Sequence, residues 1–217
     1  CRKNKIVLIE DSSESFGSEI DKKKIGSFGD INVTSIRSEK MIGVGEGGIL
    51  SFSKKNLYEK ALLFASRHAP FRTRKDPYWK KYFVNGEGYN YLMPHLLGAV
   101  ARAQIEKFSK SMLPKKIKIA QFYKKIFTDR RIELTQKRAK NHKVVYWLNS
   151  IYFKDLNKKQ VNKIGAELMK HGVEVRSGFW PLNKQAGFDF KYIGNKKSKA
   201  SSVSDDIFYK SLVLPSN

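Results

Sequence analysis

The sequence predicts an α/β protein built in two parts, and two features indicate this. Short apolar strands alternate with amphipathic helices along residues 6–127. A separate strand–helix–strand set follows between residues 144 and 176, which is typical of a smaller α/β domain. The 217 residues are sufficient for both parts. We expect a larger domain over residues 1–120 and a smaller one over residues 121–217.

The first strand is predicted at Ile6–Ile9, because a short continuous apolar run is typical of a strand buried on both faces of a parallel sheet. Glu10 and Asp11 follow at its carboxyl end, where open α/β sheets bind their ligands. The next predicted elements are a turn-rich segment at 17–30, strands at 31–36 and 48–52 around a glycine-rich loop, and a helix at 55–66.

Residues 67–88 form a long polar loop, which in a compact domain usually serves a function. Pro94 is expected in the first turn of a helix that runs to about Phe108. The remaining predicted elements are a helix at 115–127, a strand at 144–153, a helix at 157–171 that is capped by Asn157 and ended by Gly172, and a strand at 173–176.

The composition is that of a globular protein, with 41% hydrophobic and 29% charged residues. No apolar run reaches the roughly 18 residues that a membrane span needs. We therefore expect no membrane association. One cysteine cannot form an internal disulfide, so nothing indicates an oxidising compartment and we expect the protein in the cytoplasm. The chain opens at Cys1, beside a predicted core strand, and stops after an apolar stretch, so we expect it to be a fragment cut at both ends.

The net charge of +23 allows a nucleic-acid-binding protein as an alternative. The lysines are scattered along the chain rather than gathered in one stripe, and no nucleic-acid-binding module is recognisable. We therefore interpret most of them as solvated surface and expect no nucleic-acid partner. A basic field would also attract a substrate that carries a diphosphate. The four histidines and one cysteine are widely spaced, so no metal site is expected.

Two residue types in the first part could carry chemistry. Lys40 lies between strand 31–36 and the glycines of residues 43–48, which allow a ligand to approach the backbone closely. Asp11 is a helix cap, a surface charge or the partner of a cationic ring nitrogen, as pyridoxal phosphate requires. Neither position is decisive alone.

Taken together, an ordered series of motifs along the whole chain resembles the DegT-type family of sugar-nucleotide aminotransferases. These motifs are Glu-Asp-x-x-Glu-x-x-Gly at 10–17, Gly-Ser-Phe-Gly-Asp at 26–30, Ser35 five residues before Lys40, Gly-Glu-Gly-Gly at 45–48, Arg67-His68, Tyr78-Trp79, Gly-Tyr-Asn-Tyr at 88–91, Ala-Gln-Ile-Glu at 103–106, Tyr146-Trp147, Gly-Val-Glu-Val-Arg at 172–176, Phe-Trp-Pro-Leu at 179–182 and Leu-Pro-Ser at 214–216.

The resemblance implies the aspartate-aminotransferase type of fold (fold type I), with a three-layer αβα large domain and a small α/β domain. It implies homodimers that share their active sites. Residues 1–120 would be the C-terminal part of the large domain, because the family's phosphate-binding helix and ring-stacking face come from sequence upstream of the first strand. We expect the 217 residues alone not to hold the cofactor tightly.

The resemblance also assigns roles to single residues. Lys40 would hold pyridoxal 5′-phosphate as a Schiff base and then act as general acid and base. The other cofactor residues would be Asp11 at the pyridine nitrogen, Glu14 near the 3-hydroxyl, Ser35 at the phosphate and Asn90 at the phosphate of the neighbouring subunit. His68 and Arg176 are weaker expectations for contact with the sugar nucleotide.

The implied reaction moves an amino group from glutamate, through pyridoxamine 5′-phosphate, to a keto-deoxysugar nucleotide for cell-surface polysaccharide. The C-terminal motifs are most similar to family members that make GDP-perosamine, from a substrate such as GDP-4-keto-6-deoxymannose. Ser38-Glu39, Leu92 and His95 differ from residues that are frequent in the family, and these differences bear on which substrate the resemblance implies more than on the reaction. Two alternatives are a dehydratase of the same fold, against which Lys40 argues because dehydratases carry histidine there, and a truncated inactive copy.

Overall fold

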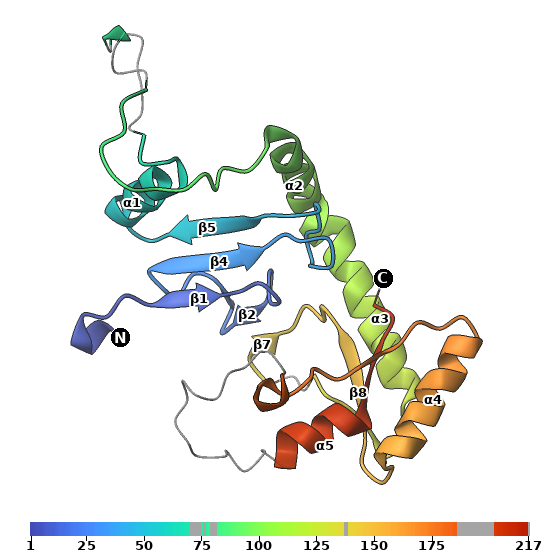
Figure 1. Ribbon diagram of the computed structural model, residues 1–217. Coiled ribbons are helices and arrows are strands. Elements are labelled where there is room, and N and C mark those ends of the chain that lie inside the picture. The colour runs from blue at the N-terminus through green and yellow to red at the C-terminus, as the bar shows by residue number, and fades with distance from the viewer. Residues whose placement is uncertain (70–74, 76, 79–81, 137–138, 186–201, 217) are drawn as a thin grey trace. The chain divides into compact units, whose positions relative to one another are not determined.

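The computed structural model describes residues 1–69, 75, 77–78, 82–136, 139–185 and 202–216 (Figure 1). Backbone contacts divide the chain into two compact units. The first unit is Cys1–Leu113 with Lys140–Val145, and the second is Pro114–Ala139 with Tyr146–Asn217. The domain boundary expected at residue 120 stays a prediction.

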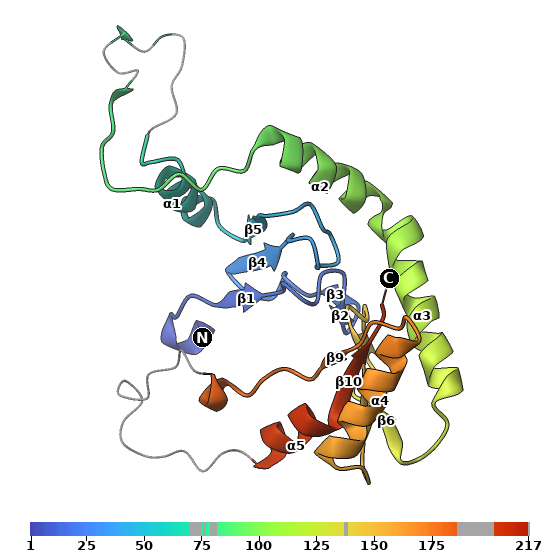
Figure 2. The same cartoon turned by 45° about the vertical axis from the view of Figure 1, so that its right-hand side comes forward.

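A three-stranded sheet organises the first unit, and its strands lie side by side in Figures 1 and 2. Its order is β1 (Ile9–Asp11), β4 (Ile31–Ser35) and β5 (Gly48–Phe52). β1 pairs with β4 in parallel and β4 with β5 antiparallel. The predicted strand at 48–52 is therefore confirmed, and the one at 31–36 is confirmed but for its last residue.

The first strand was predicted too early in the chain. A 3₁₀ turn at Arg2–Asn4 precedes it, and the ladder begins at Ile9, which pairs with Ile31. Ile6 and Ile9 are 58% and 59% exposed, so this apolar run is not buried on both faces in this chain. Pairing with β4, rather than hydrophobicity, sets where β1 starts.

The segment at 17–30 contains short strands as well as turns. β2 (Glu19–Ile20) and β3 (Lys23–Lys24) form a tight hairpin, and β2 also pairs with β7 (His142–Lys143). This three-stranded sheet joins residues more than a hundred positions apart, which no local pattern could indicate.

The helices of the first unit are α1 (Lys55–Ala65) and α2 (His95–Lys107). Pro94 is the N-cap of α2 and not, as predicted, a residue of its first turn. The two helices predicted at 94–108 and 115–127 are not separate: a π-helical segment, Phe108–Met112, continues α2 into α3 (Leu113–Ile126). Pro114 is the second residue of α3, so its missing backbone N–H falls directly after the π-helical segment, where the regular α-helical hydrogen-bond pattern is already interrupted.

The second unit is built on a four-stranded antiparallel sheet, in the order β6 (Ile132–Leu134), β8 (Asn149–Phe153), β10 (Ser211–Leu214) and β9 (Arg176–Ser177). Its helices are α3 from Pro114 onward, α4 (Lys158–Lys170), α5 (Ser202–Lys210) and a 3₁₀ turn at Leu182–Lys184. Its buried core consists of Ile151, Phe153, Val161, Val175, Leu212 and Leu214.

The two strands predicted in this unit are present but differ from their predicted bounds. The strand expected at 144–153 begins at Asn149, because Tyr146 has a left-handed backbone with φ of 54° that interrupts any extended run. The strand expected at 173–176 is reduced to Arg176–Ser177. The predicted helix is confirmed: Asn157 and Gln160 form a reciprocal capping box at its start. No helix within the described residues is long and apolar enough to cross a membrane.

Candidate active site

The carboxyl ends of β1 and β4 place two of the predicted site residues on one face of the sheet. Asp11, the last residue of β1, pairs with Val33 of β4. Paired residues of neighbouring strands point to the same face, and so does every second residue along a strand. Ser35, which ends β4, therefore shares the face of Asp11. Asp11 is exposed and Ser35 is half-buried there.

Lys40 lies in the loop that leaves β4. Its Nζ atom is 3.0 Å from Oε1 of Glu14, in the segment that leaves β1. The Lys40 side chain is 13% exposed and that of Glu14 is 54% exposed, so the carboxylate meets the amine from the solvent side. The structure thus brings two predicted cofactor residues together, from segments 26 positions apart.

Asp11 is held in its ionised form. Hydrogen bonds from the hydroxyl and the backbone N–H of Ser13 lower the pKa of Asp11, and the charge of Lys40 lowers it further, against a smaller opposing effect of desolvation. A carboxylate that is ionised at neutral pH can pair with a protonated ring nitrogen.

A buried hydrogen-bond network holds the carboxyl end of β1 against β4. Ser12 is 2% exposed, and its hydroxyl donates to the side-chain oxygen of Asn32 at 2.7 Å. It also lies 2.7 Å from the hydroxyl of Thr34, to which the Asn32 amide donates at 3.1 Å. Because buried hydroxyls and amides need partners, this network fixes β1 against β4 next to Asp11.

Glu10 fixes the Gly-Ser-Phe-Gly turn. Its carboxylate accepts hydrogen bonds from the backbone N–H groups of Gly26, Phe28 and Gly29, at 2.9, 2.7 and 2.5 Å. Desolvation opposes ionisation of this group, but the three hydrogen bonds together outweigh it and lower the pKa of Glu10. The carboxylate that precedes Asp11 is therefore structural.

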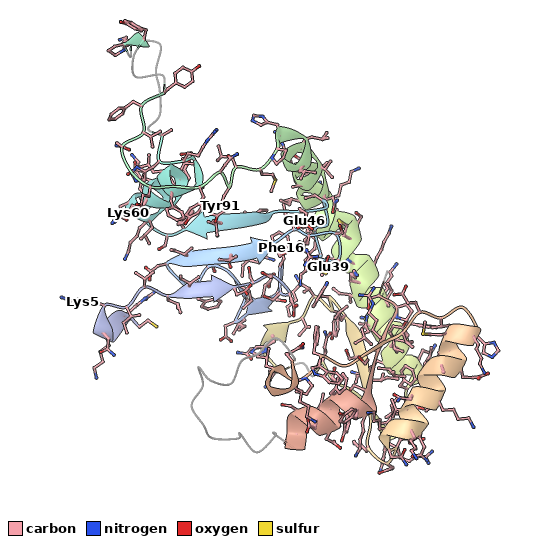
Figure 3. All side chains as sticks on the ribbon, in the orientation of Figure 1. Lys5, Phe16, Glu39, Glu46, Lys60 and Tyr91 are labelled. Carbon is pink, nitrogen blue, oxygen red and sulfur yellow. The ribbon has the colours of Figure 1, made fainter. Side chains whose placement is uncertain are left out.

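The loop from Arg37 to Gly47 is folded tightly upon itself. Ile36 donates its N–H to Gly47 and accepts one from Val44, at 3.1 and 3.0 Å. Arg37 contacts the carboxylates of Glu39 and Glu46, which Figure 3 shows near one another at this loop, at 3.4 and 3.6 Å. These contacts within the loop hold the backbone on which Lys40 lies.

The sequence reasoning missed one residue of this loop's surroundings. Gln104, on α2, makes two hydrogen bonds to the backbone of Gly43, three residues after Lys40. Gln104 is part of the Ala-Gln-Ile-Glu motif at 103–106, but nothing in the sequence indicates its partner 61 positions away.

Asn90 and His68 lie together at the end of α1 rather than with Lys40. Asn90 forms an isolated β-bridge with Ser66 and is exposed. The ring of His68 lies 2.8 Å from the side-chain oxygen of Asn85. The neighbouring Tyr91, labelled in Figure 3, stacks on Tyr89 with ring centres 5.2 Å apart. This aromatic segment fixes the backbone of Asn90 but leaves its side chain at the surface.

Arg176 belongs to the second unit. It lies on β9 with an exposed side chain and is paired with Glu174 at 3.1 Å. Trp79, part of a predicted motif, lies outside the described residues. Among the residues that the structure describes, no group of three or more His, Cys, Asp or Glu side chains could hold a metal ion.

The residues around Lys40 fit pyridoxal phosphate in chemical type. Lys40 offers an amine for the aldehyde, and Asp11 an ionised carboxylate for the ring nitrogen. Ser35 offers a hydroxyl for a phosphate oxygen, and the N–H of Arg37 lies 3.4 Å from that hydroxyl. These groups come from the ends of β1 and β4 and the loop that follows β4, where ligands of open α/β sheets bind.

Comparisons with known proteins identify the family of this chain. The DegT/DnrJ/EryC1/StrS aminotransferase family matches residues 1–217. GDP-perosamine synthase from Escherichia coli O157:H7 is 27% identical over 216 residues, which cover 100% of this chain and 54% of that protein. The chain thus spans about half the length of the curated relatives that it matches over its whole length.

Solved structures match in fold. Helicobacter pylori PseC, described as an aminotransferase of pseudoaminic acid biosynthesis, has a TM-score of 0.83 at 23% identity and covers 99% of this chain and 55% of its own. The sugar aminotransferase Spr1654 from Streptococcus pneumoniae, in its pyridoxal phosphate form, has a TM-score of 0.83 at 18% identity, covering 98% and 53%. The predicted aminotransferase fold is confirmed, and the chain belongs to the DegT/DnrJ/EryC1/StrS aminotransferase family.

Proposed function

We propose that the protein carrying this chain is a pyridoxal-phosphate-dependent aminotransferase that transfers an amino group from glutamate to a keto group of a nucleotide-linked deoxysugar. One observation carries the proposal most directly. The amine of Lys40 is presented at the carboxyl edge of the sheet, 3.0 Å from Glu14 and close enough to Asp11 to lower the pKa of its carboxyl group. Family membership supports it, as do relatives named as transaminases.

Bound pyridoxal phosphate supplies an electron sink and a carrier for the amino group. The chain supplies the rest. Asp11, ionised at neutral pH, keeps the ring nitrogen protonated. The hydroxyl of Ser35, which accepts a hydrogen bond from the backbone N–H of Arg37, would donate to the phosphate, and Glu14 faces the amine from the solvent side. Asn90, exposed on its segment, is proposed to reach the phosphate of a second subunit in a homodimer.

Lys40 holds the cofactor and also moves protons. Once glutamate has replaced it on the cofactor, the Nζ atom of Lys40 would take up the proton that leaves the α-carbon of glutamate and pass it to the C4′ atom of the cofactor. In the second half-reaction the same atom would carry a proton from C4′ to the sugar carbon that gains nitrogen. The small exposed fraction of Lys40 keeps these transfers away from bulk water.

The proposed acceptor is a keto-deoxysugar nucleotide such as GDP-4-keto-6-deoxymannose. Two of the relatives that match the whole chain are named GDP-perosamine synthase, and the net charge of +23 attracts a diphosphate. His68 and Arg176 are the proposed contacts to the sugar nucleotide. We place the reaction in the cytoplasm, among the steps that supply sugars for cell-surface polysaccharide.

The substrate is tested with the protein expressed from its complete reading frame and loaded with pyridoxal phosphate. Incubation with ¹⁵N-labelled glutamate and GDP-4-keto-6-deoxymannose is expected to give a ¹⁵N-labelled amino sugar, detected by mass spectrometry. A UDP-linked 4-keto sugar serves as the competing substrate. Labelling of the UDP sugar alone would correct the nucleotide, and labelling of neither would contradict the proposed acceptor class.

A further inference from the structure

Gln104 holds the loop of Lys40 from the neighbouring helix. The side-chain oxygen of Gln104 accepts a hydrogen bond from the N–H of Gly43 at 3.0 Å, and its side-chain nitrogen donates to the carbonyl of Gly43 at 2.6 Å. Both backbone polar groups of one residue are thus satisfied by one amide. The two partners are 61 positions apart and partly buried, so the contact ties α2 to the loop.

Gly43 occupies a position that leaves no room for a side chain. A Cβ atom built on Gly43 would lie 2.4 Å from the carbonyl oxygen of Ser38. Ser38 in turn donates its N–H to Gly45 at 3.0 Å, which closes the loop across its middle. The backbone at Gly43 is therefore packed against the opposite arm of the loop, and Gln104 holds it there.

Lys40 lies between these fixed points. Its own N–H donates to Arg37 at 2.9 Å, and the two residues after it, Met41 and Ile42, have buried side chains. The backbone from Lys40 to Gly43 is therefore held by the hydrogen bond to Arg37 at its start, by the buried side chains of Met41 and Ile42, and by the Gln104 amide at Gly43. The direction in which the amine of Lys40 leaves the loop depends on all of them.

We infer that Gln104 is a positioning residue for Lys40, which sets the angle at which the amine meets the cofactor and the substrate carbon. This inference rests on the proposed function. A purely structural role would lower stability without changing the reactions of Lys40. A positioning role changes the rates of those reactions, because a misplacement of about 1 Å can cost 100-fold in rate.

Three variants separate these roles. Gln104→Met keeps the length of the side chain and removes both hydrogen bonds. Gln104→Glu has a pH-dependent outcome: the protonated acid can accept from the N–H and donate to the carbonyl of Gly43 as the amide does, whereas the ionised form sets a negative oxygen against that carbonyl. Ala101→Gly is the control, because Ala101 is buried on the same helix and has no hydrogen bond to the loop.

The first readout needs no cofactor. In the cofactor-free protein, hydrogen exchange at the amide of Gly43 is expected to be about tenfold faster in Gln104→Met than in Ala101→Gly, which is the scale of one lost hydrogen bond. The second readout uses the protein and its variants expressed from the complete reading frame. It is the rate constant at which added pyridoxal phosphate becomes linked to Lys40, followed by its absorbance. We expect it to fall about 10- to 100-fold in Gln104→Met. Gln104→Glu should approach the unsubstituted protein at low pH and Gln104→Met at high pH.

Attachment rates in Gln104→Met equal to those of Ala101→Gly, in a protein that does link the cofactor, would overturn the positioning role alone. Equal exchange at Gly43 in the two variants would also overturn it, because the two hydrogen bonds would then not hold the loop. An unsubstituted protein that links no cofactor would overturn the proposed function and this inference with it.

Discussion

The Nζ atom of Lys40 and the Oε1 atom of Glu14 lie 3.0 Å apart, although the lysine side chain is largely covered and the glutamate is half exposed. The contact joins the loop after β4 to the segment after β1 and orients the amine along the edge of the sheet. It gives Glu14 a second task besides its expected place near the cofactor's 3-hydroxyl.

Replacing Glu14 with alanine is predicted to lower the turnover number modestly. A partly exposed ion pair contributes about 1 kcal/mol or less, so the loss is expected to be at most about fivefold. Glu14→Gln is the matched control, since it keeps a side-chain oxygen at the same reach. Steady-state kinetics check this, and equal losses in both variants would mean that the charge of Glu14, and not its hydrogen bond, matters.

Asp11→Asn is predicted to affect chemistry far more than binding. The amide cannot hold the ring nitrogen in its protonated form, so turnover is expected to fall about 100-fold or more, the scale of one lost electrostatic group in an active site. Single-turnover rates with glutamate measure the effect. Asp21→Asn, on the exposed β2–β3 hairpin, is the control. Unchanged rates in Asp11→Asn would remove Asp11 from the site.

We predict that the turn at residues 26–29, which the Glu10 carboxylate holds, loses stability in acid. The folded pKa of Glu10 lies below the usual 4.5, so its carboxylate stabilises the fold above that pH, and this contribution is lost as the pH falls through the lowered value. Glu10→Gln is expected to be less stable at neutral pH and to show a flatter decline on acidification. Urea midpoints at several pH values between neutral and acid test this, and parallel pH profiles for the two proteins would contradict it.

The Asn157 cap is predicted to stabilise the second unit against unfolding. Its side chain accepts from the N–H of Gln160 at 3.1 Å, and loss of such a cap costs about 1 kcal/mol. Asn157→Ala should therefore lower the urea midpoint of this unit, whereas Asn157→Ser, which keeps an accepting oxygen, should not. The fluorescence of Trp147 and Trp180, both in the second unit, provides the signal. Equal midpoints in both variants would show that the cap contributes nothing.

The sequence predicted correctly those helices and strands that are determined by neighbouring residues. β5 and α4 were found from turn residues, helical spacing and the Asn157 cap. The elements that were missed depend on distant partners or on unusual backbone angles. β1 begins where β4 pairs with it, β2 needs β7, and Tyr146 ends an extended run through a left-handed angle that its side chain does not announce.

The residues of the candidate site also fall into those that the sequence could indicate and those that it could not. The positions of Asp11, Glu14, Ser35 and Lys40 could be predicted because their motifs lie within 30 residues and end on two adjacent strands. The contact of Gln104 with Gly43 could not, because it depends on how α2 packs against the loop. The roles predicted for all site residues stay proposals: Asp11, Glu14, Ser35, Lys40, Asn90, His68 and Arg176.

The most direct test of the central proposal is an absorbance spectrum of the protein, expressed from its complete reading frame with pyridoxal phosphate, beside its Lys40→Ala variant. We predict a visible band of lysine-linked cofactor that shifts when glutamate is added and is absent from the variant. A Lys24→Ala variant, which removes an exposed lysine of the hairpin, should keep the band. A protein without the band, or one whose band survives Lys40→Ala, would contradict the assignment of Lys40 and the proposed activity with it.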